Sequence, residues 1–218
     1  MERQEPMHVY DPPLIIKKAL PFFFWNTSDK RILLTFDDGP NPDTTDIILT
    51  ALNKFGIKAL FFCVGNNLDR YGSLPGEILS EGHELGNHTF NHRKLSFIGS
   101  HLASEEIEKT NKVAFDKYGQ RLRFFRPPYG KFDHMTHRIV KKNGLHMVLW
   151  SLLTYDWQNS LSVVKKGIEN NLKGNSIVCL HDNTKSKNVL TDSIELICEK
   201  AALNNYQFGT AETCLIKR

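Results

Sequence analysis

Short apolar runs alternate along the chain with segments in which apolar residues recur at helical spacing. The apolar runs predict strands at residues 31–36, 58–64, 84–86, 123–125, 145–149, 176–180 and 207–210. The helical spacing predicts helices at residues 44–55, 75–81, 104–117, 133–143, 161–172 and 190–204. The first of these helices has a capping residue in Asp43 or Thr44 and ends at Gly56, a residue typical of helix C-termini.

The alternation of strand and helix predicts a mainly parallel sheet, because parallel strands need long crossover connections that are usually helical. The chain contains no internal repeat, low-complexity tract or linker, which favours a single domain. In open parallel sheets and in closed barrels alike, ligands bind beyond the carboxyl ends of the strands. The residues that follow each predicted strand are therefore the candidate functional residues.

Composition narrows the functional class. The 218 residues carry a formal charge of +4, with 40% hydrophobic and 24% charged residues, which excludes a disordered chain. There is no run of about 18 apolar residues, so no membrane span is predicted. Lys and Arg are mixed with Asp and Glu, so we expect no nucleic-acid partner. The four cysteines form no Cys-x-x-Cys pair, which favours buried free thiols over two disulfides.

Two histidines have a spacing that suits a metal site. His88 and His92 are separated by three residues, so their imidazoles could converge on one metal ion or could be two surface histidines. Asp38, at the end of an apolar run, is a natural third ligand. Two histidines and one carboxylate leave coordination positions for water and substrate, which is typical of a catalytic metal.

A second carboxylate precedes Asp38. If Asp38 binds a metal, Asp37 is free to act as a base, although Asp-Asp-Gly-Pro could also be a simple turn. Arg126 could hold Asp37 ionised and oriented, or could be solvated in the rigid loop that two prolines create after it. The N–H of Tyr129 in the same loop could donate to a developing oxyanion.

One further histidine suits the role of a proton donor. His181 follows an apolar run and could be the acid that protonates a departing amine, or a histidine satisfied within the core. Asp156 could supply the carboxylate that keeps His181 protonated. Trp157 and Tyr129 offer flat faces of the kind on which sugars stack, and a packing role fits each of them equally well.

Together these residues carry a resemblance to a known family. The chain resembles the polysaccharide deacetylases, carbohydrate esterase family 4, through five motifs in order over about residues 30–212: TFDDGP at 35–40, HTFNH at 88–92, RPPYG at 126–130, DW at 156–157 and LHD at 180–182. The resemblance implies an α/β fold, a distorted and incomplete (β/α) barrel of the TIM-barrel type in a single domain. We expect residues 1–29 to be an N-terminal extension that packs on the barrel and residues 30–218 to be the catalytic domain.

The resemblance also implies an activity. It is the metal-dependent hydrolysis of N-acetyl groups on N-acetylglucosamine-containing polysaccharide or oligosaccharide, such as chitooligosaccharide or peptidoglycan, with release of acetate. The implied cofactor is Zn²⁺ or another divalent metal such as Co²⁺, Ni²⁺ or Mn²⁺. Two alternatives stay open, an esterase that removes O-acetyl groups from xylan with the same site, and a catalytically silent carbohydrate-binding homologue.

Position by position, the resemblance assigns roles that agree with this chemistry. Asp37 matches the catalytic base and Arg126 the residue that orients it, while His181 matches the acid and Asp156 the carboxylate that tunes it. Tyr129 matches the oxyanion donor and a substrate contact. The metal ligands match Asp38, His88 and His92, and the acetyl pocket matches Trp157 and Leu180.

Two positions depart from the family pattern. Leu153 stands where an Asp is often found, and Cys179 where a Leu is often found, so the surroundings of the acid and the acetyl pocket differ. The N-terminal segment has no run that matches a secretory leader. We therefore expect a cytoplasmic protein, unless a leader has been removed or export is non-classical. Separately, we expect a monomer.

Overall fold

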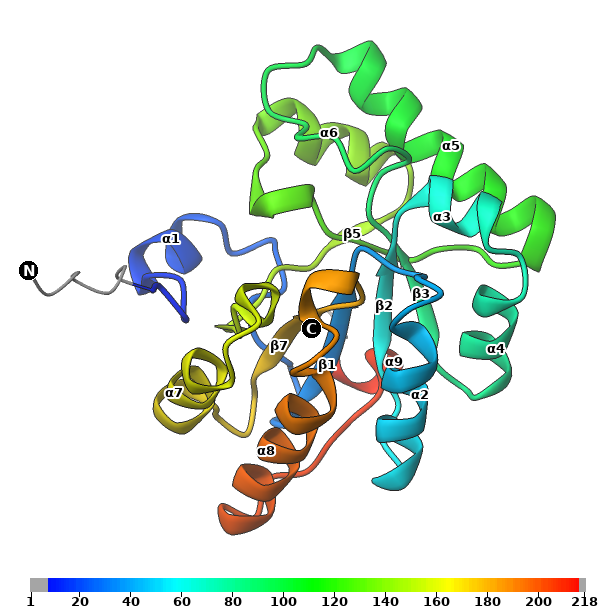
Figure 1. Cartoon of the computed structure of the whole chain (residues 1–218). Coiled ribbons are helices and arrows are strands. Elements are labelled where there is room, and N and C mark those ends of the chain that lie inside the picture. Colours follow the sequence, from blue (N-terminus) through cyan, green and yellow to red (C-terminus); the bar gives the residue numbers. More distant parts are fainter. Residues whose placement is uncertain (1–7, 216–218) are drawn as a thin grey trace, which may run out of the picture.

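Seven strands form one parallel sheet that curls into a half-barrel in the computed structural model, which describes residues 8–215 (Figure 1). The order across the sheet is β5-β4-β3-β2-β1-β7-β6, and all neighbouring pairs are parallel. The strands are β1 (Leu33–Asp37), β2 (Leu60–Cys63), β3 (Glu84–Asn87), β4 (Phe124–Phe125), β5 (His146–Met147), β6 (Leu152–Leu153) and β7 (Ile177–His181). The predicted parallel α/β fold and incomplete barrel are confirmed.

Helices connect and cover the strands. They are α1 (Leu14–Ala19), α2 (Thr45–Lys54), α3 (Gly65–Arg70), α4 (Leu74–Ser80), α5 (Ser100–Tyr118), α6 (His134–Lys142), α7 (Leu161–Asn171), α8 (Leu190–Leu203) and α9 (Ala211–Cys214). Short 3₁₀ helices follow β4, β6 and β7 and are η1 (Pro128–Gly130), η2 (Asp156–Gln158) and η3 (Thr184–Ser186). Gly56, after α2, has a φ of 64°, the left-handed conformation predicted for a glycine at a helix C-terminus.

The two faces of the sheet differ because side chains alternate along each strand. Leu34 and Phe36 point outward into the main core cluster, which includes buried residues of α2, α7 and α8 (Figure 1). Leu33 points inward, in a second cluster that α9 closes at the amino end of the strands. Thr35 and Asp37 continue this inner face toward the carboxyl end. The inner face thus changes from apolar to polar along the strand.

Most differences from the sequence-based prediction lie in short elements. The predicted strand at 207–210 is wrong, since the segment makes only a single bridge, Ile32 with Phe208. Thr210 instead begins α9, where its side chain accepts a hydrogen bond from the N–H of Thr213 in a capping box. The elements β6, α1, α3 and α9 were not predicted, because two to six residues are too few to show a periodicity.

The described part of the N-terminal segment contacts the barrel. Phe23, Phe24 and Trp25 are buried, and the N–H of Phe24 donates to the carbonyl of Met147 at 3.0 Å.

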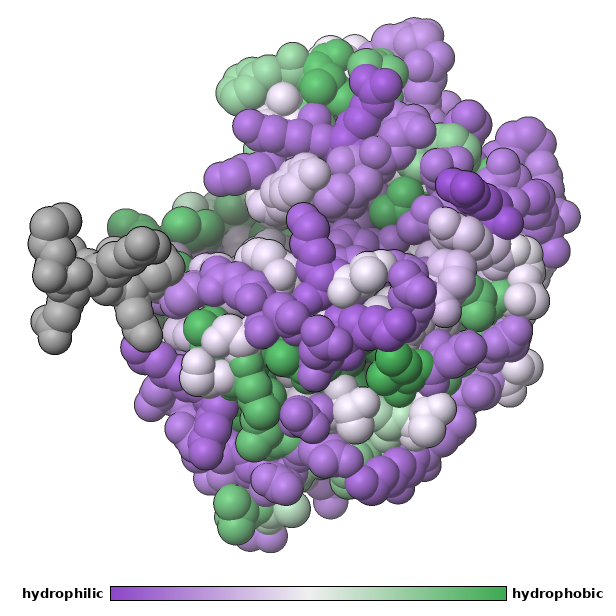
Figure 2. Space-filling model, in the orientation of Figure 1, coloured by the Kyte–Doolittle hydropathy of each residue, from purple (hydrophilic) through white to green (hydrophobic). Residues whose placement is uncertain are grey.

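All four cysteines are buried free thiols, as predicted. The surface in Figure 2 is mostly hydrophilic, with apolar residues in small groups. None of the helices within residues 8–215 has both the length and the hydropathy to cross a bilayer.

One helix supplies a matched test of the core. Ile197 of α8 is fully buried in the main cluster, whereas Leu203, at the end of the same helix, is 82% exposed. We expect Ile197→Ala to lower the free energy of unfolding by about 2–5 kcal/mol, because it removes buried methylene groups and leaves a cavity. Leu203→Ala should change it by less than about 0.5 kcal/mol. Urea denaturation measures both, and equal losses would contradict the assignment of this face to the core.

Candidate active site

The carboxyl ends of neighbouring strands bring the predicted polar residues together. Asp37 ends β1 and His181 ends β7, and the two residues are register partners in adjacent strands. They open into a cavity of about 690 Å³. Seven of the ten predicted site residues line this cavity, namely Asp37, Asp38, His88, His92, Tyr129, Trp157 and His181. Arg126 and Asp156 are fully buried and contact the lining residues from behind.

A buried ion pair holds the proposed base. The Nη1 atom of Arg126 donates to Oδ1 of Asp37 at 2.7 Å and to the hydroxyl of Thr35 at 2.7 Å. Nε of Arg126 donates to the carbonyl of Val148 at 3.2 Å, and Nη2 donates to the carbonyl of Leu149 at 2.7 Å. Because all of these partners are buried or backbone groups, the guanidinium is fixed in one orientation. Asp37 is therefore held with Oδ2 directed away from Arg126.

Asp38, His88 and His92 form the candidate metal centre. One ligand atom from each lies within 4.8 Å of the other two. The Nε2 atoms of His92 and His88 are 3.1 Å and 3.7 Å from Oδ1 of Asp38. The other nitrogen of His88, Nδ1, bonds the carbonyl of Arg126 at 2.7 Å, which leaves Nε2 for a cation. The side-chain amide of Asn183 donates to Oδ2 of Asp38 at 2.6 Å, so Oδ1 of Asp38 remains available to a cation.

The protonation states of these residues fit a divalent cation. Burial lowers the pKa of His88 to about 4, so its imidazole is neutral at physiological pH. Burial acts to raise the pKa of Asp38, but the hydrogen bond from His92 and the charge of protonated His181 outweigh it and lower that pKa overall. A neutral imidazole and an ionised carboxylate are the forms that bind metal. The donor set of two nitrogens and one oxygen therefore fits a catalytic metal such as zinc.

Backbone geometry places several of these side chains. Asp38, Thr89, His92 and Tyr129 have φ values of 77°, 64°, 55° and 60°. This left-handed region is uncommon for residues other than glycine, and such residues cluster at functional sites. The turns after β1, β3 and β4 thus direct side chains into the cavity at some cost in backbone strain.

His181 is held by a single carboxylate through two bonds. Nδ1 of His181 lies 2.8 Å from Oδ1 of Asp156, and the backbone N–H of His181 donates to Oδ2 of Asp156 at 2.8 Å. The hydroxyl of Thr154 also donates to Asp156. Burial acts to lower the pKa of His181, but the charge of Asp156 and the hydrogen bond to it raise the pKa to about 9. His181 is consequently protonated at neutral pH, and Nε2 remains to face the cavity.

The apolar wall of the cavity differs from the sequence-based prediction at one residue. Leu180 does not line the cavity, and the prediction that it does is wrong. Side chains alternate along β7, so Leu180 points outward into the main core cluster while Cys179 and His181 point inward. Trp157 does line the cavity, with its ring 4.6 Å from that of His181.

Some contributing residues were not identified from the sequence. Asn183 follows the LHD segment directly, and Trp150 lines the cavity against Gly130, where a Cβ atom would lie 2.6 Å from the indole. Glu106 is a buried carboxylate in α5, 3% exposed. Its signal in the sequence is a charge on the face of the helix that carries Ala103 and Ile107.

Glu106 restrains the loop that bears His92. Its Oε2 accepts the backbone N–H groups of Phe90 and Asn91 at 3.0 Å and 2.7 Å, and its Oε1 accepts the side-chain amide of Asn91 at 2.7 Å. The guanidinium of Arg93 lies 3.2 Å from Oε1. This single carboxylate thus ties residues on both sides of Asn91, next to a candidate metal ligand.

Comparison with known proteins gives consistent matches. The profile of a family described as polysaccharide deacetylase matches residues 25–148. A peptidoglycan-N-acetylglucosamine deacetylase of Bacillus cereus is 31% identical over 86% of this chain and 89% of its own length. PgdA of Listeria monocytogenes, a protein of the same description, is 31% identical over 85% of this chain, which spans only 39% of that relative. The crystal structure of the peptidoglycan N-acetylglucosamine deacetylase Bc1960 has a TM-score of 0.85 at 24% identity, over 92% of this chain and 97% of that one, and shows the same fold.

The role of Glu106 can be tested through metal affinity. We expect Glu106→Gln to weaken Zn²⁺ binding by about 10–100-fold, because an amide replaces the charged acceptor that holds the loop of His92. Glu105→Gln, at an exposed position of the same helix, is the matched control and should leave the affinity unchanged. Isothermal titration of the metal-free protein measures both, and equal affinities in the two variants would contradict this role.

Proposed function

The chain belongs to the polysaccharide deacetylase family, carbohydrate esterase family 4, and on that premise we propose that it removes N-acetyl groups from N-acetylglucosamine-containing glycans with release of acetate. Chitooligosaccharide and peptidoglycan are the substrates we propose, because relatives named for these activities share 31–34% identity with the chain. The observation that carries the proposal is the convergence of a base, an acid and three potential metal ligands on one cavity.

Asp38, His88 and His92 would hold the cation. We propose Zn²⁺, with Co²⁺, Ni²⁺ or Mn²⁺ as substitutes, because imidazole nitrogen and carboxylate oxygen suit these ions. When bound, such a cation polarises a carbonyl and lowers the pKa of a water molecule. All of these side chains come from one chain, which supports an active monomer.

The residues of the chain supply the proton transfers. Asp37, ionised and held by Arg126, accepts the proton of the attacking water through Oδ2. The N–H of Tyr129 donates to the oxyanion that develops on the acetyl carbonyl oxygen. His181, protonated because of Asp156, donates from Nε2 to the departing glucosamine nitrogen. The acetyl group leaves as acetate, and the glycan is left with a free amine.

The retained groups argue against a catalytically silent protein. Asp37, His181 and the three ligands are all present, and each is oriented by at least one hydrogen bond or ion pair. The flat rings of Trp157 and Tyr129 at the cavity suit the face of a sugar. An O-acetyl esterase would use the same groups, so acetylated xylan is the substrate that distinguishes the two activities.

The activity can be tested by acetate release from three substrates. We expect acetate from chitooligosaccharide or peptidoglycan, because an amide leaving group needs the protonation that His181 provides, and much less from acetylated xylan. A chelator should abolish the release and added Zn²⁺ should restore it. Xylan as the sole substrate would replace the proposal with the esterase, and no release from any of the three would overturn it.

The same assay tests the base. Asp37→Asn should bind metal normally but release acetate about 10²–10⁴-fold more slowly, because the amide cannot accept the proton of water. Asp43→Asn, at an exposed position in the loop after β1, is the matched control and should keep full activity. Full activity of Asp37→Asn would remove Asp37 from this role.

The pH dependence tests the acid. Activity requires protonated His181, so it should fall as the pH rises through the pKa of that residue, which is about 9 in the free protein. Asp156→Asn removes the charge that raises this pKa, so the alkaline limb of kcat/KM should move to lower pH. Asp116→Asn, on the exposed face of α5, should leave the limb in place. An unmoved limb in Asp156→Asn would assign the titration to another group.

A further inference from the structure

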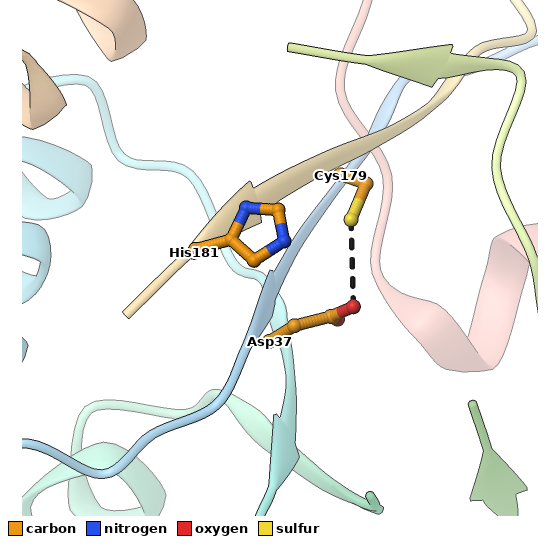
Figure 3. A group of neighbouring side chains, drawn as sticks. All are labelled: Asp37, Cys179 and His181. Carbon is orange, nitrogen blue, oxygen red and sulfur yellow. Dashed lines mark hydrogen bonds between the residues drawn. The ribbon is translucent and has the colours of Figure 1, made fainter. Parts of the chain in front are cut away.

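Three inward-facing side chains form a second group beside the candidate metal centre. Asp37 on β1 is the register partner of His181 on β7, and Cys179 lies two residues before His181 on the same face of β7. Figure 3 shows the three side chains directed toward one another. One oxygen, sulfur or nitrogen atom from each lies within 4.8 Å of the other two. β1 and β7 are paired neighbours, with β2 and β6 on either side of them, so their backbones keep these atoms close.

The other polar atoms of the group are already bonded. Arg126 occupies Oδ1 of Asp37, and Asp156 lies against Nδ1 of His181. The atoms that remain available to a cation are Oδ2 of Asp37, Sγ of Cys179 and Nε2 of His181. The thiol of Cys179 donates to Oδ2 at 3.5 Å, the contact drawn as a dashed line in Figure 3. The group therefore presents three donor atoms of different kinds to one small region of the cavity wall.

We propose that Asp37, Cys179 and His181 form a second cation site, which binds thiophilic divalent cations such as Cd²⁺ or excess Zn²⁺ and inhibits the enzyme. The site shares no residue with Asp38, His88 and His92. It adjoins them, because Oδ2 of Asp37 lies 3.9 Å from Nε2 of His88. A sulfur, a nitrogen and a carboxylate oxygen suit zinc and softer ions and disfavour Mg²⁺ and Ca²⁺, which prefer oxygen.

Binding at this site exchanges protons for a cation without any redox change. Burial and the charge of Asp37 raise the pKa of the Cys179 thiol, so the sulfur carries a proton in the cation-free protein. On binding, the S–H bond of Cys179 and the Nε2–H bond of protonated His181 break. The cation then bonds sulfur, nitrogen and Oδ2 of Asp37, and both protons leave to solvent. Thiolate is the form of cysteine that ligates metals.

The inhibition, though not the binding, rests on the proposed function. A cation bound here occupies Oδ2 of Asp37, the atom that accepts the proton of water, and Nε2 of His181, the atom that protonates the leaving nitrogen. It also fills space in the cavity beside the first metal centre. Such a cation would compete with substrate for the cavity.

Cadmium binding to the full, metal-free chain tests the site directly. The first centre contains no sulfur, so a sulfur-to-cadmium charge-transfer band in the ultraviolet reports the second site alone. We expect about two equivalents of Cd²⁺ per wild-type chain, with the band present. Cys179→Ser should bind about one equivalent without the band, and Cys198→Ser, at a buried cysteine of α8, should match the wild type. His181→Asn keeps the thiol and should lower the Cd²⁺ affinity of the site that gives the band by more than about 10-fold.

The outcomes separate this proposal from the proposed function. Absence of the band in the wild type, or a band that persists in Cys179→Ser, would overturn the second site. Near-ultraviolet circular dichroism establishes that each variant is folded, and His181→Asn provides the test if Cys179→Ser is not. In the acetate assay with Zn²⁺ present, added Cd²⁺ should inhibit the wild type at least about 10-fold more than Cys179→Ser, each relative to its own rate. Absence of acetate release would overturn the proposed function, while the band would still decide the site.

Discussion

The buried ion pair between Arg126 and Asp37 organises the carboxyl end of the sheet. A charge in this position without a partner would cost several kcal/mol, so each group requires the other. Arg126 also bonds Thr35 of β1 and the carbonyls of Val148 and Leu149. The pair therefore joins strands that are far apart in the sequence. It also holds the carboxylate of Asp37 at the inner face of the half-barrel.

Arg126 also orients His88, one of the candidate metal ligands. The side chain of Arg126 holds Asp37, and its backbone carbonyl accepts a hydrogen bond from Nδ1 of His88 at 2.7 Å. This bond directs Nε2 of His88 toward Asp38. Asp156 acts comparably on the other side of the site, where one carboxylate bonds both the ring and the backbone N–H of His181. Two buried charged residues, neither of which lines the cavity, thus determine the orientation and charge of the groups that do.

Much of the fold could be predicted because the longer strands are continuous apolar runs and the long helices have a clear helical periodicity. β1 and β7 are continuous buried runs, and the helix predicted at 190–204 is observed as α8, Leu190–Leu203. The errors have physical reasons. β6 has only two residues, and the apolar segment near Phe208 becomes a bridge because the capping box of Thr210 starts a helix there. Leu180 was assigned to the cavity by motif position, although strand alternation places it opposite His181.

The sequence by itself determined which chemical groups are available and in which turns they lie, because residue type and local spacing are properties of short segments. It indicated Asp38, His88 and His92 as one set and His181 with Asp156 as another. Only the tertiary structure decided how these sets meet, which atoms remain for a cation or a proton, and that Trp150, Asn183 and Glu106 belong to the site. Burial and pair distances depend on contacts between strands up to about 140 residues apart, as for Asp37 and Cys179, and periodicity along the chain carries no record of them.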